Sequence, residues 1–141
     1  MQIKFVIPGP PKGKGRPRFS RMGSFVRAYT PKATANYEEL VLLCWRTQSG
    51  VRFTQKIPLR MEIRGYFQVP KSLSQRKRAE LLGSPHVNKC DCDNLAKIVM
   101  DAISGEVFTD DAIISELLVT KYYDENARVE VKIEPCENLQ R

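Results

Sequence analysis

Apolar and polar residues alternate along four stretches of the chain, which is the pattern of strands that bury one face. The first stretch covers residues 2–8, and its apolar face carries Ile3, Phe5 and Ile7. The same alternation predicts three more strands, at residues 58–69, 113–122 and 127–133. Gly65 interrupts the second of the four strands, which predicts a β-bulge at that glycine.

Apolar residues three and four positions apart predict a long helix over residues 30–47. Thr30 is the expected N-cap, and Pro31 the expected first helical residue, which is a favoured place for proline. The stripe of this helix that we expect to be buried consists of Tyr37, Leu40, Val41 and Cys44, with Trp45 beside it.

Two shorter helices are predicted in the middle of the chain. One covers about residues 72–83, begins at a serine cap and is strongly basic. The other covers residues 94–104, with Asp93 as its N-cap and Gly105 just past its end. Helices and strands therefore interleave. The predicted fold class is α+β (α/β mixed): a single domain over residues 1–141, with a mixed β-sheet packed against about three helices.

The segment before the long helix is irregular and basic, and we treat about residues 9–31 as one Pro/Gly-rich loop. Residues 9–18 read GPPKGKGRPR, in which prolines and glycines exclude regular structure. Residues 19–30 could form a loose hairpin around a turn at residues 22–24. We expect Phe25 to belong to the core.

The formal net charge is +7, and it is unevenly distributed. Residues 1–37 contain eight Lys or Arg and no acid, whereas residues 85–126 contain nine acids and three lysines. This separation predicts a cationic surface around an acidic centre. Cationic surfaces bind the phosphate backbone of nucleic acid by releasing counterions, although they also serve solubility alone. The basic residues that we expect to contact DNA are Lys12, Lys14, Arg16, Arg18, Arg76 and Lys77.

Composition disfavours several other kinds of site. Cys90 and Cys92 have a single residue between them, which is too close for a zinc site, and no second Cys/His pair completes one. His86 is the only histidine, which argues against His-pair and His–Cys mechanisms. No apolar run has the length of a membrane span, and the N-terminus does not have the order of a signal peptide. We therefore expect a cytoplasmic protein.

The stretch KCDCDNLAKIVMDAI, residues 89–103, concentrates acids at the start of a predicted helix. Asp91 and Asp93 would point the same way in an extended chain. Residues 105–111 are long enough to run back along the helix and bring one member of the Asp110-Asp111 pair beside them. Close carboxylates repel one another unless a cation lies among them, and hard oxygen ligands suit Mg²⁺ or Mn²⁺.

Such a metal would activate water for the cleavage of a phosphodiester bond, and Lys97 could stabilise the developing charge or position the water. Each acid also has a structural explanation. Asp93 could simply cap a helix, Asp101 could pair with Lys97 four positions away, and residues 110–111 could form a turn. Their joint occurrence favours the metal site. An EF-hand calcium loop is excluded, because Ala96 stands where its turn glycine would be.

The order of these residues resembles the RusA family of Holliday-junction resolvases, a family of phage and prophage type. Its pattern D-x-D-N-x-x-K-x-x-x-D-x-[IL], followed by Gly and an Asp-Asp pair, is matched here by Asp91, Asp93, Asn94, Lys97, Asp101, Ile103, Gly105, Asp110 and Asp111. The opening FVIPGPPKGKGRPR is similar to the Pro/Gly/basic N-terminus of that family. The resemblance covers essentially the whole chain.

The resemblance implies a crossover junction endodeoxyribonuclease that cuts four-way DNA junctions with paired symmetric nicks, in DNA recombination and repair. It implies a homodimer, since two cuts related by a two-fold axis need two sites, and it implies Mg²⁺ or Mn²⁺ as the metal. The catalytic residues that it implies are Asp91, Asp93, Lys97 and Asp111, with the three aspartates as metal ligands and Asp101 and Asp110 as possible supporting acids. Phe19 and Phe25 could each stack on bases in the open centre of a junction or join the core, and for Phe25 the core is the preferred interpretation.

Two other functions fit parts of the sequence. One is a non-catalytic DNA-binding protein, such as a phage regulator, whose acids are only caps and ion pairs. The other is a phosphotransferase acting on nucleotides, but GPPKGKGR does not have the spacing of a phosphate-binding loop. A loss of cutting in Asp93→Asn would separate the nuclease from the DNA-binding protein.

Overall fold

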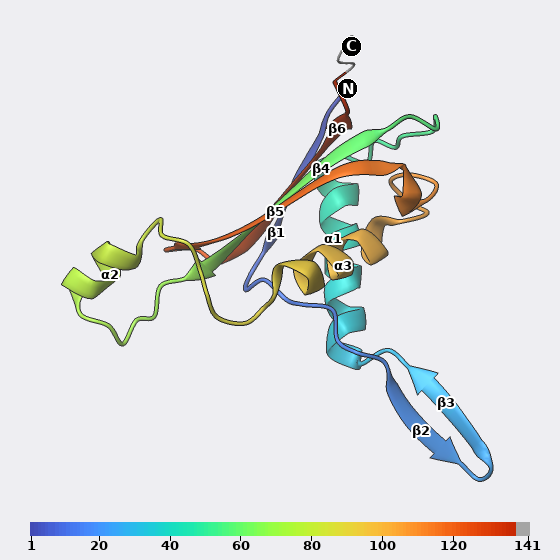
Figure 1. The fold of residues 1–141 in the computed structure, drawn as a ribbon, viewed down its shortest axis with the longest axis horizontal. Coiled ribbons are helices and arrows are strands. Elements are labelled where there is room, and N and C mark those ends of the chain that lie inside the picture. The colour runs from blue at the N-terminus through green and yellow to red at the C-terminus, as the bar shows by residue number, and fades with distance from the viewer. Residues whose placement is uncertain (138–141) are drawn as a thin grey trace.

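The computed structural model describes residues 1–137, in which three α-helices and a mixed β-sheet form the predicted α+β fold (Figure 1). In chain order the elements are β1 (Ile3–Pro8), β2 (Arg18–Met22), β3 (Phe25–Tyr29), α1 (Lys32–Gln48), β4 (Leu59–Gln68), α2 (Gln75–Leu81), α3 (Cys92–Ile103), the short 3-10 helix η1 (Asp111–Ile113), β5 (Ile114–Asp124) and β6 (Arg128–Pro135). The four strands predicted from alternation are all present. None of the helices within residues 1–137 is long and apolar enough to cross a membrane.

The main sheet has the strand order β1-β6-β4-β5. β6 runs antiparallel to both β1 and β4, whereas β4 and β5 run parallel. Parallel neighbours need a crossover, and here the crossover contains α2 and α3. The consequence is that α3, with its acidic start, is delivered directly before the edge strand β5.

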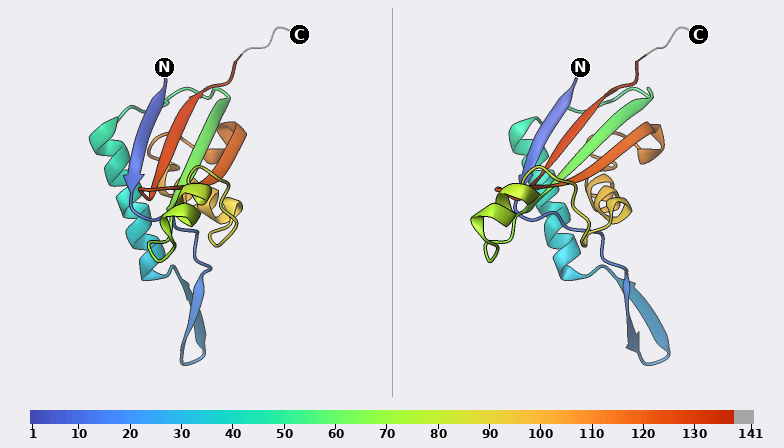
Figure 2. Two further views of the ribbon diagram at one scale, coloured as in Figure 1. Left: turned by 90° about the vertical axis from the view of Figure 1, so that its left-hand side faces the viewer. Right: turned by 60° about the vertical axis from the view of Figure 1, so that its left-hand side comes forward.

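One face of the sheet forms the core. Alternate residues of β1, β4 and β6 are buried, as the sequence pattern predicts. Helices α1 and α3 contact each other and lie on this face (Figures 1 and 2). The buried side chains that α3 contributes are Leu95, Ala96, Ile98, Val99, Ala102 and Ile103. This apolar stripe fixes the orientation of α3 and leaves its polar residues on the outer face.

Gly65 is required by close packing and not by a bulge, so the predicted bulge is wrong. Gly65 pairs in regular register with Lys121 of β5, and the one irregularity between β4 and β5 lies between Leu59 and Arg60. A Cβ atom at Gly65 would lie 2.9 Å from the Cδ2 atom of the buried Leu95. The glycine therefore lets α3 lie closely on the sheet.

The ends of the helices differ in two places from the sequence prediction. Pro31, and not Thr30, is the N-cap of α1. Asp91, and not Asp93, is the N-cap of α3, which begins at Cys92. Both helices thus begin one or two residues away from the predicted cap, where sequence signals are least certain.

The predicted stripe of α1 is largely confirmed, since Tyr37, Val41, Cys44 and Trp45 are buried and Leu40 is half-buried. Ser74 caps α2 as predicted, its hydroxyl accepting a hydrogen bond from the backbone N–H of Lys77. Gly105 follows α3 with a φ of +85°, a conformation that favours glycine.

Strands β2 and β3 form a separate two-stranded hairpin that projects away from the rest of the molecule (Figure 1). We call residues 18–29 the arm. The hairpin and its turn are as predicted, and Gly23 in the turn has a φ of +62°. The expectation that Phe25 belongs to the core is wrong, because its side chain is 77% exposed. Every residue of both strands is exposed.

Candidate active site

The loop that leads into α3 is held by a lysine of the sheet. Lys121 on β5 donates two hydrogen bonds from its Nζ atom, to the backbone oxygen of Asn88 at 2.8 Å and to that of Cys90 at 2.7 Å. An ammonium group makes stronger hydrogen bonds than a neutral donor. Lys121 therefore fixes the backbone immediately before Asp91.

The same loop is anchored by an aromatic stack. The ring of His86 lies parallel to that of Phe67 on β4, with centroids 3.6 Å apart, and meets the ring of Tyr123 on β5 edge-on at 4.9 Å. Burial, aided by the charge of Lys121, lowers the pKa of His86 below its ordinary value. His86 is therefore a neutral packing residue at neutral pH. The side-chain amide of Asn88 donates to the hydroxyl of Tyr123 at 3.1 Å, which adds a further contact.

Two predicted metal ligands lie at the start of α3. Asp91 is the N-cap and Asp93 lies in the first turn, and both residues are exposed. The Asp91 carboxylate makes no capping hydrogen bond within residues 1–137, so its oxygen atoms stay free for other ligands. The positive end of the helix dipole favours negative groups at both positions. α3 therefore presents two carboxyl side chains to solvent at one end.

The basic loop, which consists of residues 9–17 before the arm, lies against the start of α3 directly beside these carboxylates. The backbone N–H of Lys14 donates to the backbone oxygen of Asn94 at 2.9 Å. A Cβ atom at Gly13 would lie 3.1 Å from the Cβ atom of Asn94 and 3.2 Å from the Sγ atom of Cys90. A glycine at this position therefore allows the loop to lie against the start of α3.

Asp101, on the outer face of α3, forms an ion pair with Lys14 of the basic loop. Its carboxylate lies 3.4 Å from the Nζ atom of Lys97 and 3.3 Å from that of Lys14, which also pairs with Glu38 of α1. Burial lowers the pKa of Lys14, but hydrogen bonds to Glu38 and Asp101 outweigh burial and raise it above its ordinary value. Lys14 thus fastens the loop to α1 and α3, whereas Lys97 is largely exposed.

The Asp110-Asp111 pair lies at the start of η1. Asp110 is the N-cap, and its carboxylate accepts the backbone N–H of Ala112 at 3.1 Å, which lowers its pKa below the ordinary value. The hydrogen bond shared with Asp110 raises the pKa of Asp111, as do slight burial and the negative charge of Asp101, while Lys97 opposes the rise. The charges of Asp101 and Lys97 thus act on Asp111.

The predicted gathering of three carboxylates at one point is not observed. Within residues 1–137 no three His, Cys, Asp or Glu side chains form a group that could hold a metal ion. The return of the chain after α3 brings Asp111 into the electrostatic neighbourhood of Asp101 and Lys97. Asp91 and Asp93 lie at the opposite end of the same helix from Asp101.

The residues predicted to contact DNA lie in two places. Lys12, Arg16 and Arg18 are exposed along the basic loop and the start of the arm, whereas the ammonium of Lys14 is taken up by ion pairs. Arg76 and Lys77 are exposed on α2, where Arg76 pairs with Glu80 at 3.6 Å. Figure 1 shows α2 and the arm at opposite ends of the molecule. DNA contact by these residues stays a prediction.

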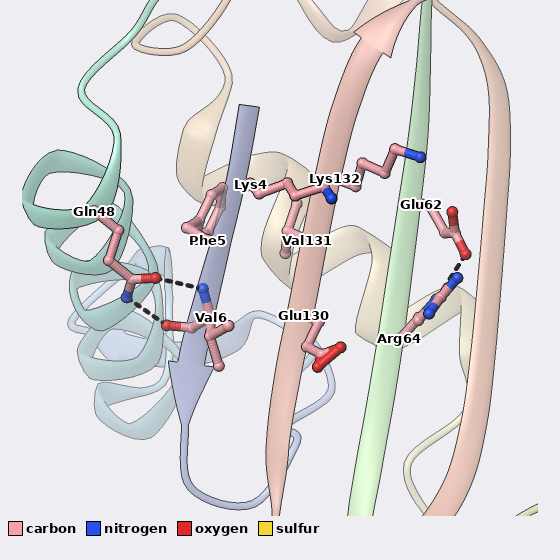
Figure 3. Close-up of a pocket in the computed structure, with 9 residues that line it drawn as sticks. All are labelled: Lys4, Phe5, Val6, Gln48, Glu62, Arg64, Glu130, Val131 and Lys132. Atoms are coloured by element: carbon pink, nitrogen blue, oxygen red, sulfur yellow. Dashed lines mark hydrogen bonds and ion pairs between the residues drawn. The ribbon is translucent and has the colours of Figure 1, made fainter. Parts of the chain in front are cut away.

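A shallow pocket lies on the sheet face that carries no helix (Figure 3). Its lining alternates in charge, with Glu62 and Arg64 paired at 2.7 Å. Gln48 of α1 closes its edge, since its side-chain amide exchanges two hydrogen bonds of 2.7 Å with the backbone of Val6 on β1. The acids of α3 and η1 are not among its lining residues, so the pocket is separate from the candidate site.

Sequence reasoning missed the residues that position the loop before Asp91. In the sequence, Lys121 is only one of three lysines in an acidic region, and His86 is only the single histidine. No local pattern identifies them, because the partners of Lys121 are 31 and 33 residues away along the chain and those of His86 lie on β4 and β5. Arg21 and Arg27 of the arm were also missed, although the absence of acids before residue 38 marks them.

Exposed carboxylates and a lysine on α3, beside a basic loop, suit phosphodiester chemistry on nucleic acid. A comparison with protein families supports that chemistry directly: the family described as "Endodeoxyribonuclease RusA" matches residues 8–134. The chain belongs to the RusA endodeoxyribonuclease family, which confirms the predicted resemblance. It is therefore assigned to the hydrolases that cut DNA internally.

A bacterial relative matches nearly the whole chain. The chain is 32% identical over 135 residues to a protein of Bacillus subtilis (strain 168) named "Uncharacterized protein YqaN". The match covers 93% of this chain and 94% of the relative. The two proteins therefore correspond from end to end, with no large region left over in either.

Proposed function

We propose that the protein is a metal-dependent crossover junction endodeoxyribonuclease, which resolves four-way DNA junctions by paired symmetric cuts in DNA recombination and repair. Membership of the RusA family supports DNA cleavage. The observation that carries the proposal is the outer face of α3, where Asp91, Asp93 and Lys97 lie exposed next to the basic loop. Negative groups for a cation and positive groups for phosphate are thus adjacent.

The carboxylates of Asp91 and Asp93 would hold the metal ion, whereas Asp111, the third ligand that the family resemblance implies, forms no metal-binding group with them within residues 1–137. Their oxygen atoms are the hard ligands that Mg²⁺ prefers, and Mn²⁺ is a suitable substitute. Mg²⁺ is usually held by one or two carboxylates together with water and substrate phosphates, so two exposed carboxylates at the start of α3 suit it in type. When bound, the ion would activate water and neutralise charge on the leaving oxygen.

The chain's own residues would perform three tasks. Lys97, whose ammonium is held over α3 by Asp101 at 3.4 Å, would neutralise a phosphate oxygen of the scissile bond. Asp110 would hold the start of η1, and with it Asp111, through the hydrogen bond that its carboxylate accepts from the backbone N–H of Ala112. Lys121 would keep Asp91 in place through the two carbonyl groups that it binds.

A homodimer follows from the proposed reaction. One chain carries one start of α3, and two cuts at symmetric positions need two such sites related by a two-fold axis. Sedimentation or light scattering of the purified protein would measure its mass in solution. A monomer that cuts both strands of a junction would contradict this part of the proposal.

The proposal is tested by incubating the protein with a synthetic four-way junction and with a linear duplex of the same length. Paired cuts in the junction should appear with Mg²⁺ and disappear with EDTA. Asp93→Asn should lower the cutting rate by about 10²–10³-fold or more while binding persists. The matched control is Glu125→Gln, an exposed acid in the turn between β5 and β6, which should cut at the normal rate.

Two results would overturn the proposal. Asp93→Asn that cuts normally would remove α3 from the chemistry. Binding without cutting under Mg²⁺ and Mn²⁺ would favour a non-catalytic DNA-binding protein, in which the acids only cap helices and form ion pairs.

A further inference from the structure

The arm carries large apolar side chains, although it lies outside the core and both of its strands are exposed. A two-stranded ribbon outside the core has no packing reason to carry large apolar side chains, yet this one does. Its exposed apolar side chains are Phe19 (71%), Met22 (65%), Phe25 (77%), Val26 (67%) and Tyr29 (45%). Exposed apolar patches on this scale mark binding surfaces.

The arm is also purely cationic. It carries Arg18, Arg21 and Arg27, and the chain has no acid before residue 38. None of the three guanidinium groups forms an ion pair with any of residues 1–137. In contrast, Lys14, just before the arm, is neutralised by two carboxylates. The arm therefore presents unneutralised positive charge.

The strand register places both kinds of side chain on both faces of the ribbon. Directly opposed residues share a face. The cross-strand pairs Arg18–Tyr29, Ser20–Arg27 and Met22–Phe25 lie on one face. The pairs Phe19–Ala28 and Arg21–Val26 lie on the other. Each face thus combines an aromatic ring with at least one arginine.

That combination suits unpaired DNA. Arginines contact phosphates, and aromatic rings stack on unpaired bases, which every base allows through its π-face. A paired duplex offers no such face, but the centre of a branched DNA does. Packing of the arm against the arm of a second copy would bring three arginines against three arginines, which like charge opposes.

The residues just before the arm, Lys14 and Gly15, contact the helices next to the candidate active site. Lys14 binds Asn94 of α3, and the backbone N–H of Gly15 donates to the hydroxyl of Thr34 on α1 at 3.1 Å. Arg18 follows only four residues after Lys14, a span of at most about 14 Å. The base of the arm, at Arg18, therefore lies close to the start of α3.

We propose that the arm recognises the branch point of DNA, with Arg21 and Arg27 on phosphates and Phe19 and Phe25 stacked on unpaired bases. The inference rests on the proposed function and adds the residues that would select branched over linear DNA. It is tested by binding alone, without metal and without cutting, so its failure is distinct from a failure of the cleavage experiment.

The experiment measures binding of an immobile four-way junction and of a linear duplex by fluorescence anisotropy in EDTA at several salt concentrations. Phe19→Ala/Phe25→Ala should weaken junction binding by at least about tenfold and leave duplex binding and the salt dependence unchanged. Arg21→Gln/Arg27→Gln should weaken both, and should reduce the salt slope by about 2. Ser20→Ala, on the same ribbon, is the matched control and should bind both as the wild type does.

Two outcomes would overturn the proposal: a Phe19→Ala/Phe25→Ala variant that binds the junction like the wild type, or one that loses junction and duplex equally. Because the arm lies outside the core, all variants should melt at the wild-type temperature. A benzoylphenylalanine placed at position 25 identifies the partner by photocrosslinking. Crosslinks to the central nucleotides of the junction support the proposal, and crosslinks only to a second protein chain contradict it.

Discussion

The body of the molecule and its arm differ in what happens to their apolar side chains. The body, which is the sheet β1-β6-β4-β5 with α1 and α3, buries the alternating apolar residues of β1, β4 and β6 between sheet and helices. The arm has the same two-residue alternation, but both of its faces are exposed. Equal patterns therefore lead to different environments, because one ribbon is covered by helices and the other is not.

The difference teaches which residues carry stability and which are free for binding. Burial of apolar area stabilises the body by about 25 cal/mol for each Å² removed from water, and the arm gains little of this. Its residues are consequently free to change without unfolding the protein. The acids of α3 combine both properties. The buried apolar face of the helix holds it in place, and its polar face is exposed to solvent.

Ile98→Ala should produce the largest change in stability. Ile98 is fully buried in α3, and truncating a buried isoleucine costs about 2–5 kcal/mol. Phe25→Ala in the arm, although it removes more atoms, should change the free energy of unfolding by less than about 0.5 kcal/mol. Urea denaturation measures both values. A comparable loss in the two variants would show that the arm packs against something in solution.

Gly65→Ala should have a smaller but specific effect. Its Cβ atom would meet Leu95 at 2.9 Å, and overpacking of a buried contact costs about 1–3 kcal/mol. Leu95→Val removes part of the opposing side chain, so it should be less harmful in the Gly65→Ala background than in the wild type. Thermal melting of the two single variants and the double variant measures this coupling. Strictly additive effects would mean that the two residues do not meet.

Lys121→Met should slow cutting by about tenfold, or about 1.4 kcal/mol, because the loop before Asp91 loses its two hydrogen bonds. Single-turnover cutting at saturating protein gives the rate without the influence of affinity. Hydrogen exchange at residues 86–91 should rise in parallel. The control is Lys132→Met on β6, whose lysine pairs with Glu134 at 3.5 Å. Unchanged exchange and cutting in Lys121→Met would exclude the positioning role.

His86→Phe should have the smallest effect, visible only as a dependence on pH. The pKa of His86 is lowered by burial and by Lys121, so the unfolded chain takes up the proton more readily. The stability due to neutral His86 is complete above about pH 6.5 and is lost as the pH falls through the lowered folded pKa. His86→Phe keeps a ring on Phe67 without the titration. As the pH falls from about 7 to about 5, the melting temperature of the variant should therefore rise relative to that of the wild type. Parallel plots of melting temperature against pH for the two proteins would contradict this.

Local patterns in the sequence were sufficient for most of the fold. The alternation in residues 2–8 and the stripe that includes Val41 and Cys44 depend only on neighbours along the chain. Phe25 was misplaced for a physical reason, because alternation reveals two faces but not whether anything covers them. Gly65 was misread likewise, since a glycine required by a neighbouring helix looks the same in sequence as one in a bulge.

The candidate site was predicted in its residues but not in its geometry. The spacing of Asp91, Asp93 and Lys97 identified the outer face of α3, and family membership supports the resemblance. The expected group of three carboxylates is not observed within residues 1–137, and the charges that act on Asp111 include those of Asp101 and Lys97. Chain length allowed several return paths, and only the packing of η1 and β5 selects one.

The most direct test of the whole account is the cutting rate of a four-way junction, measured over a range of protein concentrations with Mg²⁺. The account predicts that Phe19→Ala/Phe25→Ala reaches the wild-type maximal rate but needs about tenfold more protein. It predicts that Asp93→Asn binds at wild-type concentrations with a maximal rate lower by about 10²-fold or more. An arm variant that loses its maximal rate at unchanged affinity, or an Asp93→Asn variant that cuts normally, would contradict the division between a cutting body and a recognising arm.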